Sequence, residues 1–120
     1  MSTTPEPQIA ELTRLMRELT EERQWATFHD PKSLILALVG EVGELAELFQ
    51  WLPADAAIAA VEDAGRRERV SQEIADVLLY LVRLADVLDI DLMEAARTKH
   101  AASLTRFPVD EFRGVAPDKV

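Results

Sequence analysis

The stretch that most constrains the fold of this chain is LILALVGEVGELAELFQWL, residues 34–52. Its apolar residues recur at intervals of three and four, which indicates one buried face of an α-helix. They are Leu34, Leu38, Val42, Leu45, Phe49 and Leu52. Glu41 falls inside this face, because it lies two helical turns after Leu34 and two before Leu48. Glu44 flanks the same sector. A helix that needed only a core contact would carry a leucine at position 41.

A second stretch, residues 70–88, repeats this pattern. Its apolar residues at helical spacing are Val70, Ile74, Val77, Leu81, Leu84 and Leu88. Glu73 and Asp76 lie on or beside the core-facing side of this predicted helix. Two helices therefore each carry a pair of acids three residues apart. Burying several carboxylates without cations is very costly, so we expect these acids to be paired, protonated or bound to metal.

The rest of the chain predicts an all-α fold. We expect helices over residues 8–26, 31–52, 66–88 and 92–105, with Asp30 and Asp91 as capping residues and a proline directly after Asp30. Pro53 is expected to end the second helix. Four helices with short connections favour a four-helix bundle. The predicted domain spans residues 8–108, between a disordered lead (1–7) and a flexible tail (109–120).

Charge and composition narrow the possible partners. A net charge of −9 over 120 residues argues against binding nucleic acid through its phosphates. It does not exclude a small phosphate-bearing ligand, because a divalent metal can bridge carboxylates to phosphate. The chain has no cysteine, which excludes disulfides and thiolate metal sites. We find no secretory signal and no apolar run long enough to span a membrane, so we expect a cytoplasmic protein.

Three interpretations of the four acids remain open from the residues alone. They can form a solvated helix face, or they can pair with a cation such as Arg83 or Lys99. They can also hold a metal through oxygen ligands only, which suits Mg²⁺ or Mn²⁺ rather than zinc. Di-iron bundles use Glu-x-x-His, whereas each first acid here is followed by an acid three residues later, so redox iron is disfavoured.

The spacing of the acids resembles a known motif. The pattern E41-x-x-E44, a gap of 28 residues and then E73-x-x-D76 resembles the metal motif of the MazG-like nucleoside triphosphate pyrophosphohydrolases, an all-α family. The runs LALVGEVGELAELFQWL and DVLLYLVRLADVLDIDL are similar to its dCTP pyrophosphatase branch. The resemblance covers roughly residues 19–108. The GEVGELAELFQW run is its most specific part.

This resemblance implies an activity and a set of site residues. Glu41, Glu44, Glu73 and Asp76 would hold Mg²⁺, and a metal-activated water would cleave a nucleoside triphosphate, dCTP or a modified dCTP, into monophosphate and pyrophosphate. The positions that match the nucleotide pocket are Trp25, Phe28, His29, Trp51 and Tyr80, and those that match phosphate-holding residues are Lys99 and Arg106. Ser103 replaces a usual asparagine and Met16 a polar residue, which leaves the preferred base open.

Taken by themselves, the same residues also have simpler roles. Tyr80 borders the acid face but can pack in the core, and either tryptophan can serve a core or an interface. His29 can be a cap or an ion-pair partner. Lys99 and Arg106 share a helix face, which is either a phosphate clamp or an exposed surface. Which carboxylate acts as general base also stays open.

Two further expectations concern partners. Large apolar groups such as Phe49 and Trp51 exceed what one small bundle covers, which favours a homo-oligomer, and the resemblance implies a tetramer built from dimers. The alternatives to a dCTP pyrophosphatase are the same chemistry on another nucleotide and a non-catalytic helical module whose acids bind a basic partner.

Overall fold

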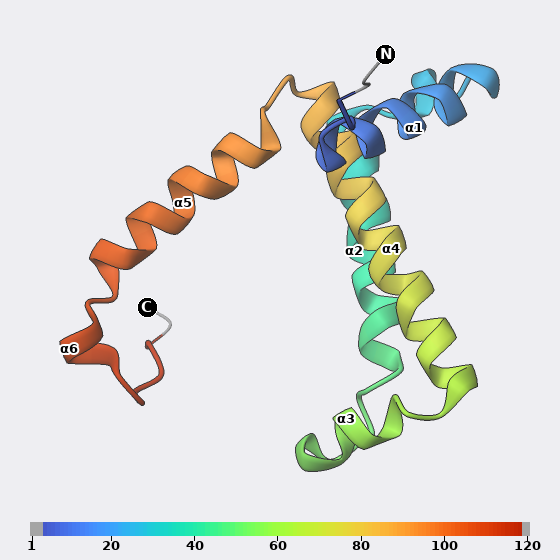
Figure 1. The fold of residues 1–120 in the computed structure, drawn as a ribbon. Helices are drawn as coiled ribbons and strands as arrows, with labels where there is room; N and C mark the ends of the chain where they lie inside the picture. Colours follow the sequence, from blue (N-terminus) through green and yellow to red (C-terminus); the bar gives the residue numbers. More distant parts are fainter. Residues whose placement is uncertain (1–3, 119–120) are drawn as a thin grey trace. The chain divides into compact units, whose positions relative to one another are not determined.

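The computed structural model describes residues 4–118 and is all-α, with no strand in that part of the chain (Figure 1). The long helices are α1 (Gln8–Glu22), α2 (Pro31–Glu47), α4 (Ala64–Val87) and α5 (Leu92–Arg106). The short elements are η1 (Ala26–Phe28), η2 (Ala54–Ala56), α3 (Ala57–Ala60) and α6 (Val109–Phe112). The predicted fold class is confirmed. The chain divides into two compact units, Met1–Asp89 and Ile90–Val120.

In the first unit, α2 lies along α4, and α1 packs against α4 (Figure 1). Leu34 of α2 and Val82 of α4 are almost completely buried. Thr20 of α1 is fully buried as well, and its hydroxyl donates a hydrogen bond of 2.7 Å to the Met16 carbonyl. This bond satisfies the hydroxyl, so a polar residue can lie in the core without an unpaired donor.

Aspartate caps begin three of the long helices. Asp30 accepts a hydrogen bond from the Ser33 backbone N–H, and Pro31 occupies the first helical position, as predicted. Asp91 caps α5 in the predicted way. Asp63 caps α4 through the Arg66 backbone N–H, which moves the start of this helix to Ala64 rather than Arg66.

Two helices end earlier in the sequence than predicted. Helix α1 ends at Glu22 because Gln24 adopts a left-handed backbone, with φ of 55°, which cannot continue the helix. Helix α2 ends at Glu47 rather than near residue 52. The Arg66 guanidinium donates a 2.6 Å hydrogen bond to the Leu48 carbonyl, so a side chain from α4 satisfies one of the carbonyls at this end.

The predicted buried faces were partly wrong. Leu34 and Leu48 are buried, in register with Glu41, but Val42 is 48% exposed. Ile74 and Leu81 of α4 and its C-cap residue Leu88 are exposed, whereas Val70 is buried. Both helices carry apolar residues around more than one side, so spacing alone did not tell which side faces the partner helix. The second apolar side of each helix is left exposed in this chain.

The second unit contains α5 and α6. The rings of Phe107 and Phe112 meet edge to face with centroids 5.2 Å apart, which joins the end of α5 to α6. Helix α6 lies within the predicted tail. Residues 1–3 of the predicted lead are outside the described residues, and the domain limits stay a prediction. Within residues 4–118, no helix is both long enough and apolar enough to cross a membrane.

Candidate functional site

Three of the four predicted acids come together between α2 and α4. Glu41 of α2 and both Glu73 and Asp76 of α4 each offer a carboxylate oxygen, and these oxygens lie within 4.8 Å of one another. All three residues are half-buried. The helices bring them together because α2 and α4 pack side by side (Figure 1). We refer to Glu41, Glu73 and Asp76 as the acid cluster.

The acid cluster is electrostatically incomplete. The Oε2 atoms of Glu41 and Glu73 are buried and have no hydrogen-bond partner among the described residues. Burial and, after it, the nearby carboxylates of Glu73, Glu44 and Asp76 together raise the pKa of the Glu41 carboxyl from 4.5 to about 7. Buried carboxylate oxygens without a donor are rare in folded proteins, so this cluster fits a bound cation.

Within the first unit, neither simpler interpretation of these acids agrees with the geometry. A solvated face would expose the carboxylates, whereas one oxygen each of Glu41 and Glu73 is buried. Among the described residues of the first unit, no Lys, Arg or His nitrogen lies within 4.0 Å of an oxygen of the four acids. Arg83, a suggested partner, instead pairs with Asp86 at 3.2 Å. Carboxylates alone form a hard oxygen donor set, which suits a hard divalent cation.

Glu44, the fourth predicted acid, is exposed and lies outside this group of three. It lines a cavity of about 320 Å³ between the second half of α2 and the first half of α4. The cavity is lined by Glu44, Glu47, Leu48, Arg69, Gln72 and Glu73, so it adjoins the acid cluster through Glu73. Three lining residues, Glu47, Arg69 and Gln72, were missed by our sequence analysis. Glu47 follows Glu44 by three residues and Arg69 precedes Glu73 by four, so helical spacing would have found two of them.

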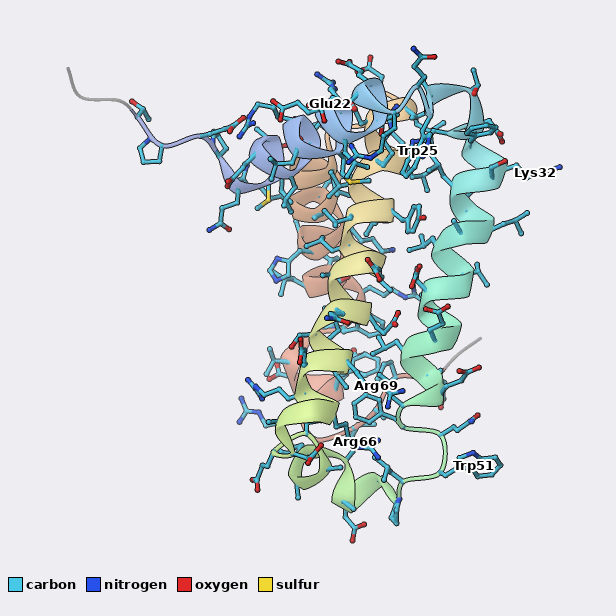
Figure 2. The ribbon with its side chains drawn as sticks, turned by 90° about the vertical axis from the view of Figure 1, so that its right-hand side faces the viewer. Glu22, Trp25, Lys32, Trp51, Arg66 and Arg69 are labelled. Atoms are coloured by element: carbon cyan, nitrogen blue, oxygen red, sulfur yellow. The ribbon has the colours of Figure 1, made fainter. Side chains whose placement is uncertain are left out.

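The predicted aromatic residues lie at both ends of α2. Trp25 and Phe28 belong to the η1 turn before this helix and are 43% and 67% exposed. Trp51 follows the helix and is 88% exposed, and Figure 2 shows the two tryptophans at opposite ends. Pro31 and Glu41 are ten residues apart, or about 15 Å along an α-helix. The turn and the acid cluster are therefore not adjacent within one chain.

The remaining predicted residues are found in three settings. Tyr80 is half-buried on α4, one turn beyond Asp76. Met16 is buried in the core of the first unit, so its apolar side chain has a packing role. In the second unit, Lys99 and Arg106 are exposed on α5, and the Arg106 guanidinium lies 5.2 Å from the Phe107 ring centroid. The Ser103 hydroxyl donates to the Lys99 carbonyl at 3.0 Å.

This architecture defines a class, the all-α proteins that gather carboxylates between two neighbouring helices. A family model described as MazG-like matches residues 37–118. The match includes all four predicted acids and covers more than half of the chain. The chain therefore belongs to the MazG-like family, and the resemblance seen in its sequence is confirmed.

Individual relatives agree with this family. The chain is 43% identical over 115 residues to dCTP pyrophosphatase 1 of Bos taurus, which covers 96% of this chain and 68% of that protein. It is 43% identical to dCTP pyrophosphatase 1 of Homo sapiens, over 89% of this chain and 63% of that protein. The chain thus spans about two thirds of the length of these relatives. The crystal structure of a pyrophosphatase from Archaeoglobus fulgidus is also similar, with a TM-score of 0.81, 35% identity, and coverage of 90% of this chain and 99% of that one.

Proposed function

We propose that this protein is a nucleotide pyrophosphohydrolase that converts a nucleoside triphosphate, preferentially dCTP or a modified dCTP, to the monophosphate and pyrophosphate. The observation that carries the proposal is the acid cluster, with its two buried carboxylate oxygens that lack a partner. Relatives named dCTP pyrophosphatase 1, which match nearly the whole chain, support dCTP as the substrate.

Glu41, Glu73 and Asp76 would hold the metal, with Glu44 at the edge of the site. We propose Mg²⁺, with Mn²⁺ as a substitute, because every available donor is a carboxylate oxygen. When bound, such an ion polarises phosphate oxygens and lowers the pKa of water. Glu44 lies outside the acid cluster and is exposed, so its carboxylate is free to accept the proton of the attacking water.

The nucleotide would be held by the aromatic residues at the two ends of α2, together with Tyr80. Exposed aromatic rings such as those of Phe28 and Trp51 offer faces on which a base can stack. Phe28, Trp25 and His29 belong to one end of the helix, and Trp51 to the other. Lys99 and Arg106 of the second unit are exposed cations and remain predicted contacts to the phosphates.

The separation of these residues supports the proposed oligomer. A helix of 17 residues is about 25 Å long, so Trp25 and Trp51 of one chain cannot both touch one base. The outer side of α2 carries an apolar strip that is 44% to 62% exposed. The strip consists of Ile35, Leu36, Val39 and Val42. A second copy that covers this strip would bring the turn of one chain to the acid cluster of another, and we propose a tetramer built from such dimers.

The test is a panel of canonical and modified nucleoside triphosphates, each assayed for monophosphate and pyrophosphate with Mg²⁺ and with excess chelator. We expect metal-dependent release of pyrophosphate, with the highest kcat/KM for a cytosine deoxynucleotide. A preference for another base would keep the chemistry and reject dCTP as substrate. No pyrophosphate from any nucleotide would reject the enzyme and favour a helical interaction module. Light scattering at micromolar concentration tests the tetramer, which a monomer of about the 13.4 kDa chain mass would exclude.

A further inference from the structure

Four side chains form a continuous polar chain at the end of the helix pair away from the cavity. The Asp86 carboxylate of α4 accepts hydrogen bonds from the Arg17 guanidinium of α1, one of them at 2.7 Å. The same carboxylate accepts from Arg83 Nη1 at 3.2 Å. Arg83 Nε donates to His29 Nδ1 at 3.1 Å. The side chains of Asp86 and Arg83 are only 11% and 12% exposed, so this is an interior arrangement rather than a surface ion pair. We refer to these four residues as the arginine relay.

The arginine relay determines the protonation state of His29. A guanidinium has donors and no acceptor, so His29 Nδ1 can bond to Arg83 only as an unprotonated acceptor. The neutral ring then carries its hydrogen on Nε2. Burial, with the positive charge of Arg83 added, lowers the pKa of His29 below 6.5, which agrees with a neutral ring. The relay thus leaves His29 with one donor of fixed position, Nε2–H.

His29 follows a turn that already has the properties of a base-binding surface. It directly follows η1, which contains the exposed Phe28 and is preceded by the exposed Trp25. Aromatic faces bind bases without discriminating between them, because every base has a π-face. Discrimination requires an oriented hydrogen-bond donor or acceptor that matches one base edge and leaves a group unpaired with another. His29 Nε2–H is such a donor, on the residue that directly follows Phe28.

We propose that Arg83 is a positioning residue that fixes the tautomer and orientation of His29, so that His29 Nε2–H discriminates between nucleotide bases. This inference rests on the proposed function, in which the turn contacts the base. Arg83 lies seven residues beyond Asp76, about 10 Å along α4, and it does not touch the acids. Its contribution is therefore to base selection and not to metal binding.

The variant that tests this inference is Arg83→Met. Methionine keeps the apolar stem of the arginine but removes its donors. Asp86 keeps its hydrogen bonds from Arg17, so the substitution leaves no unpaired buried carboxylate. Arg67→Met is the matched control, because Arg67 is an exposed arginine of α4 outside the relay. A second variant, His29→Asn, retains an acceptor near the position of Nδ1 and removes the Nε2–H donor.

The first readout is the ¹⁵N spectrum of the His29 ring in the full chain, with circular dichroism to confirm folding. In the wild type and in Arg67→Met we expect the neutral ring with hydrogen on Nε2. In Arg83→Met we expect a mixture of tautomers. An unchanged tautomer in Arg83→Met would overturn the inference, because another group would then be holding the ring.

The second readout is kcat/KM for the preferred triphosphate and for triphosphates with the other bases. In Arg83→Met and in His29→Asn we expect the preference ratio to fall about three- to tenfold, as for the loss of one hydrogen bond between neutral groups. The fall should come from KM, with kcat changed less than about twofold. The Mg²⁺-induced shift in melting temperature should be unchanged. A residue that only tied α4 to the turn before α2 would lower the melting temperature and leave the ratio intact, and that result would overturn the inference.

Failure of the proposed function itself would be seen separately. A wild-type protein that hydrolyses none of the triphosphates rejects the function before any variant is made. A wild-type enzyme with clear base preference, unchanged in Arg83→Met, keeps the function and rejects the role of Arg83.

Discussion

The acid cluster and the arginine relay both place charged side chains in the half-buried contacts of α4. Only in the relay is the buried carboxylate paired with groups of opposite charge. In the relay, Asp86 is matched by two arginines, and Arg17 foremost holds the pKa of this carboxyl below its ordinary value. In the acid cluster, burial and the carboxylates of Glu73, Glu44 and Asp76 raise the pKa of Glu41 to about 7. Where every charge has a partner of opposite sign, the contacts of the fold are enough to explain the presence of the charges. A region of unmatched like charges is the arrangement expected of a site that binds a cation.

The largest effect that we predict is loss of turnover when the acid cluster loses a ligand. Glu73→Gln keeps the side-chain volume but removes one carboxylate charge, so kcat/KM should fall by about 100-fold or more, beyond the loss seen when a mere supporting group of a metal ligand is removed. Glu68→Gln, an exposed position on the same helix, is the control and should retain wild-type activity. Activity is measured as pyrophosphate release. Equal activity in both variants would contradict the claim that the acid cluster, unlike the arginine relay, binds a ligand needed for turnover.

A smaller effect, on stability, is predicted for the arginine relay. Asp86→Asn removes the charge that Arg17 and Arg83 share, and it leaves Arg83 as a shielded cation. The free energy of unfolding should fall by about 2 kcal/mol, less than the cost of breaking a fully buried pair because Arg17 is 57% exposed. Urea denaturation of the metal-free protein measures it, with Asp110→Asn, an exposed position on α6, as control. A higher free energy of unfolding in Asp86→Asn would show that the relay destabilises the fold, as the acid cluster does.

A third effect is an opposite pH dependence of the two regions in the metal-free protein. The pKa of Glu41 is higher in the folded state, at about 7, than its ordinary 4.5, so the folded state binds the extra proton and stability should fall as pH rises from 4.5 to about 7. The pKa of Asp86 is lowered from 3.8, so its contribution is present above pH 3.8 and is lost as pH falls through the lower, folded-state value.

Melting temperatures of the metal-free protein between pH 3 and 8 check both slopes, with the assembly state held constant. Saturating Mg²⁺ should remove the decline above pH 4.5, and so should Glu41→Gln. A metal-free wild type whose stability stays level between pH 4.5 and 7 would contradict the state assigned to Glu41.

The acid cluster was predictable because helical spacing placed Glu41 in register with Leu34 and Leu48, and both of these leucines are buried. Caps were predictable for a similar reason, since Asp30 with Pro31 is a local signal that needs no tertiary contact. The two apolar sides of α2 and α4 were not distinguishable, because leucine and valine at a helical interval fit an internal contact or a contact with another chain equally well. Val42 and Ile74, which were predicted to be buried, are exposed.

The arginine relay could not be predicted from the sequence, because it joins residues that lie far apart in the chain. Arg17 and Asp86 are separated by 69 positions, and Arg83 and His29 by 54. Any of the chain's 13 basic residues is a plausible partner for an acid until the helices are packed. Arg83 is a possible partner for the four acids by sequence, but in the folded chain it bonds to Asp86 and His29 instead.

The central claim, that the acid cluster is a divalent metal site, is tested most directly by melting the wild type and Glu41→Gln with and without Mg²⁺. A ligand that binds only the folded state at 100 times its Kd stabilises it by about 2.7 kcal/mol, so Mg²⁺ should raise the wild-type melting temperature by several degrees. In Glu41→Gln the metal-free protein should melt at the same or a higher temperature than the wild type, because repulsion among the acids is relieved, and Mg²⁺ should add little. An equal Mg²⁺-induced shift in both proteins, or no shift in the wild type, would contradict the claim.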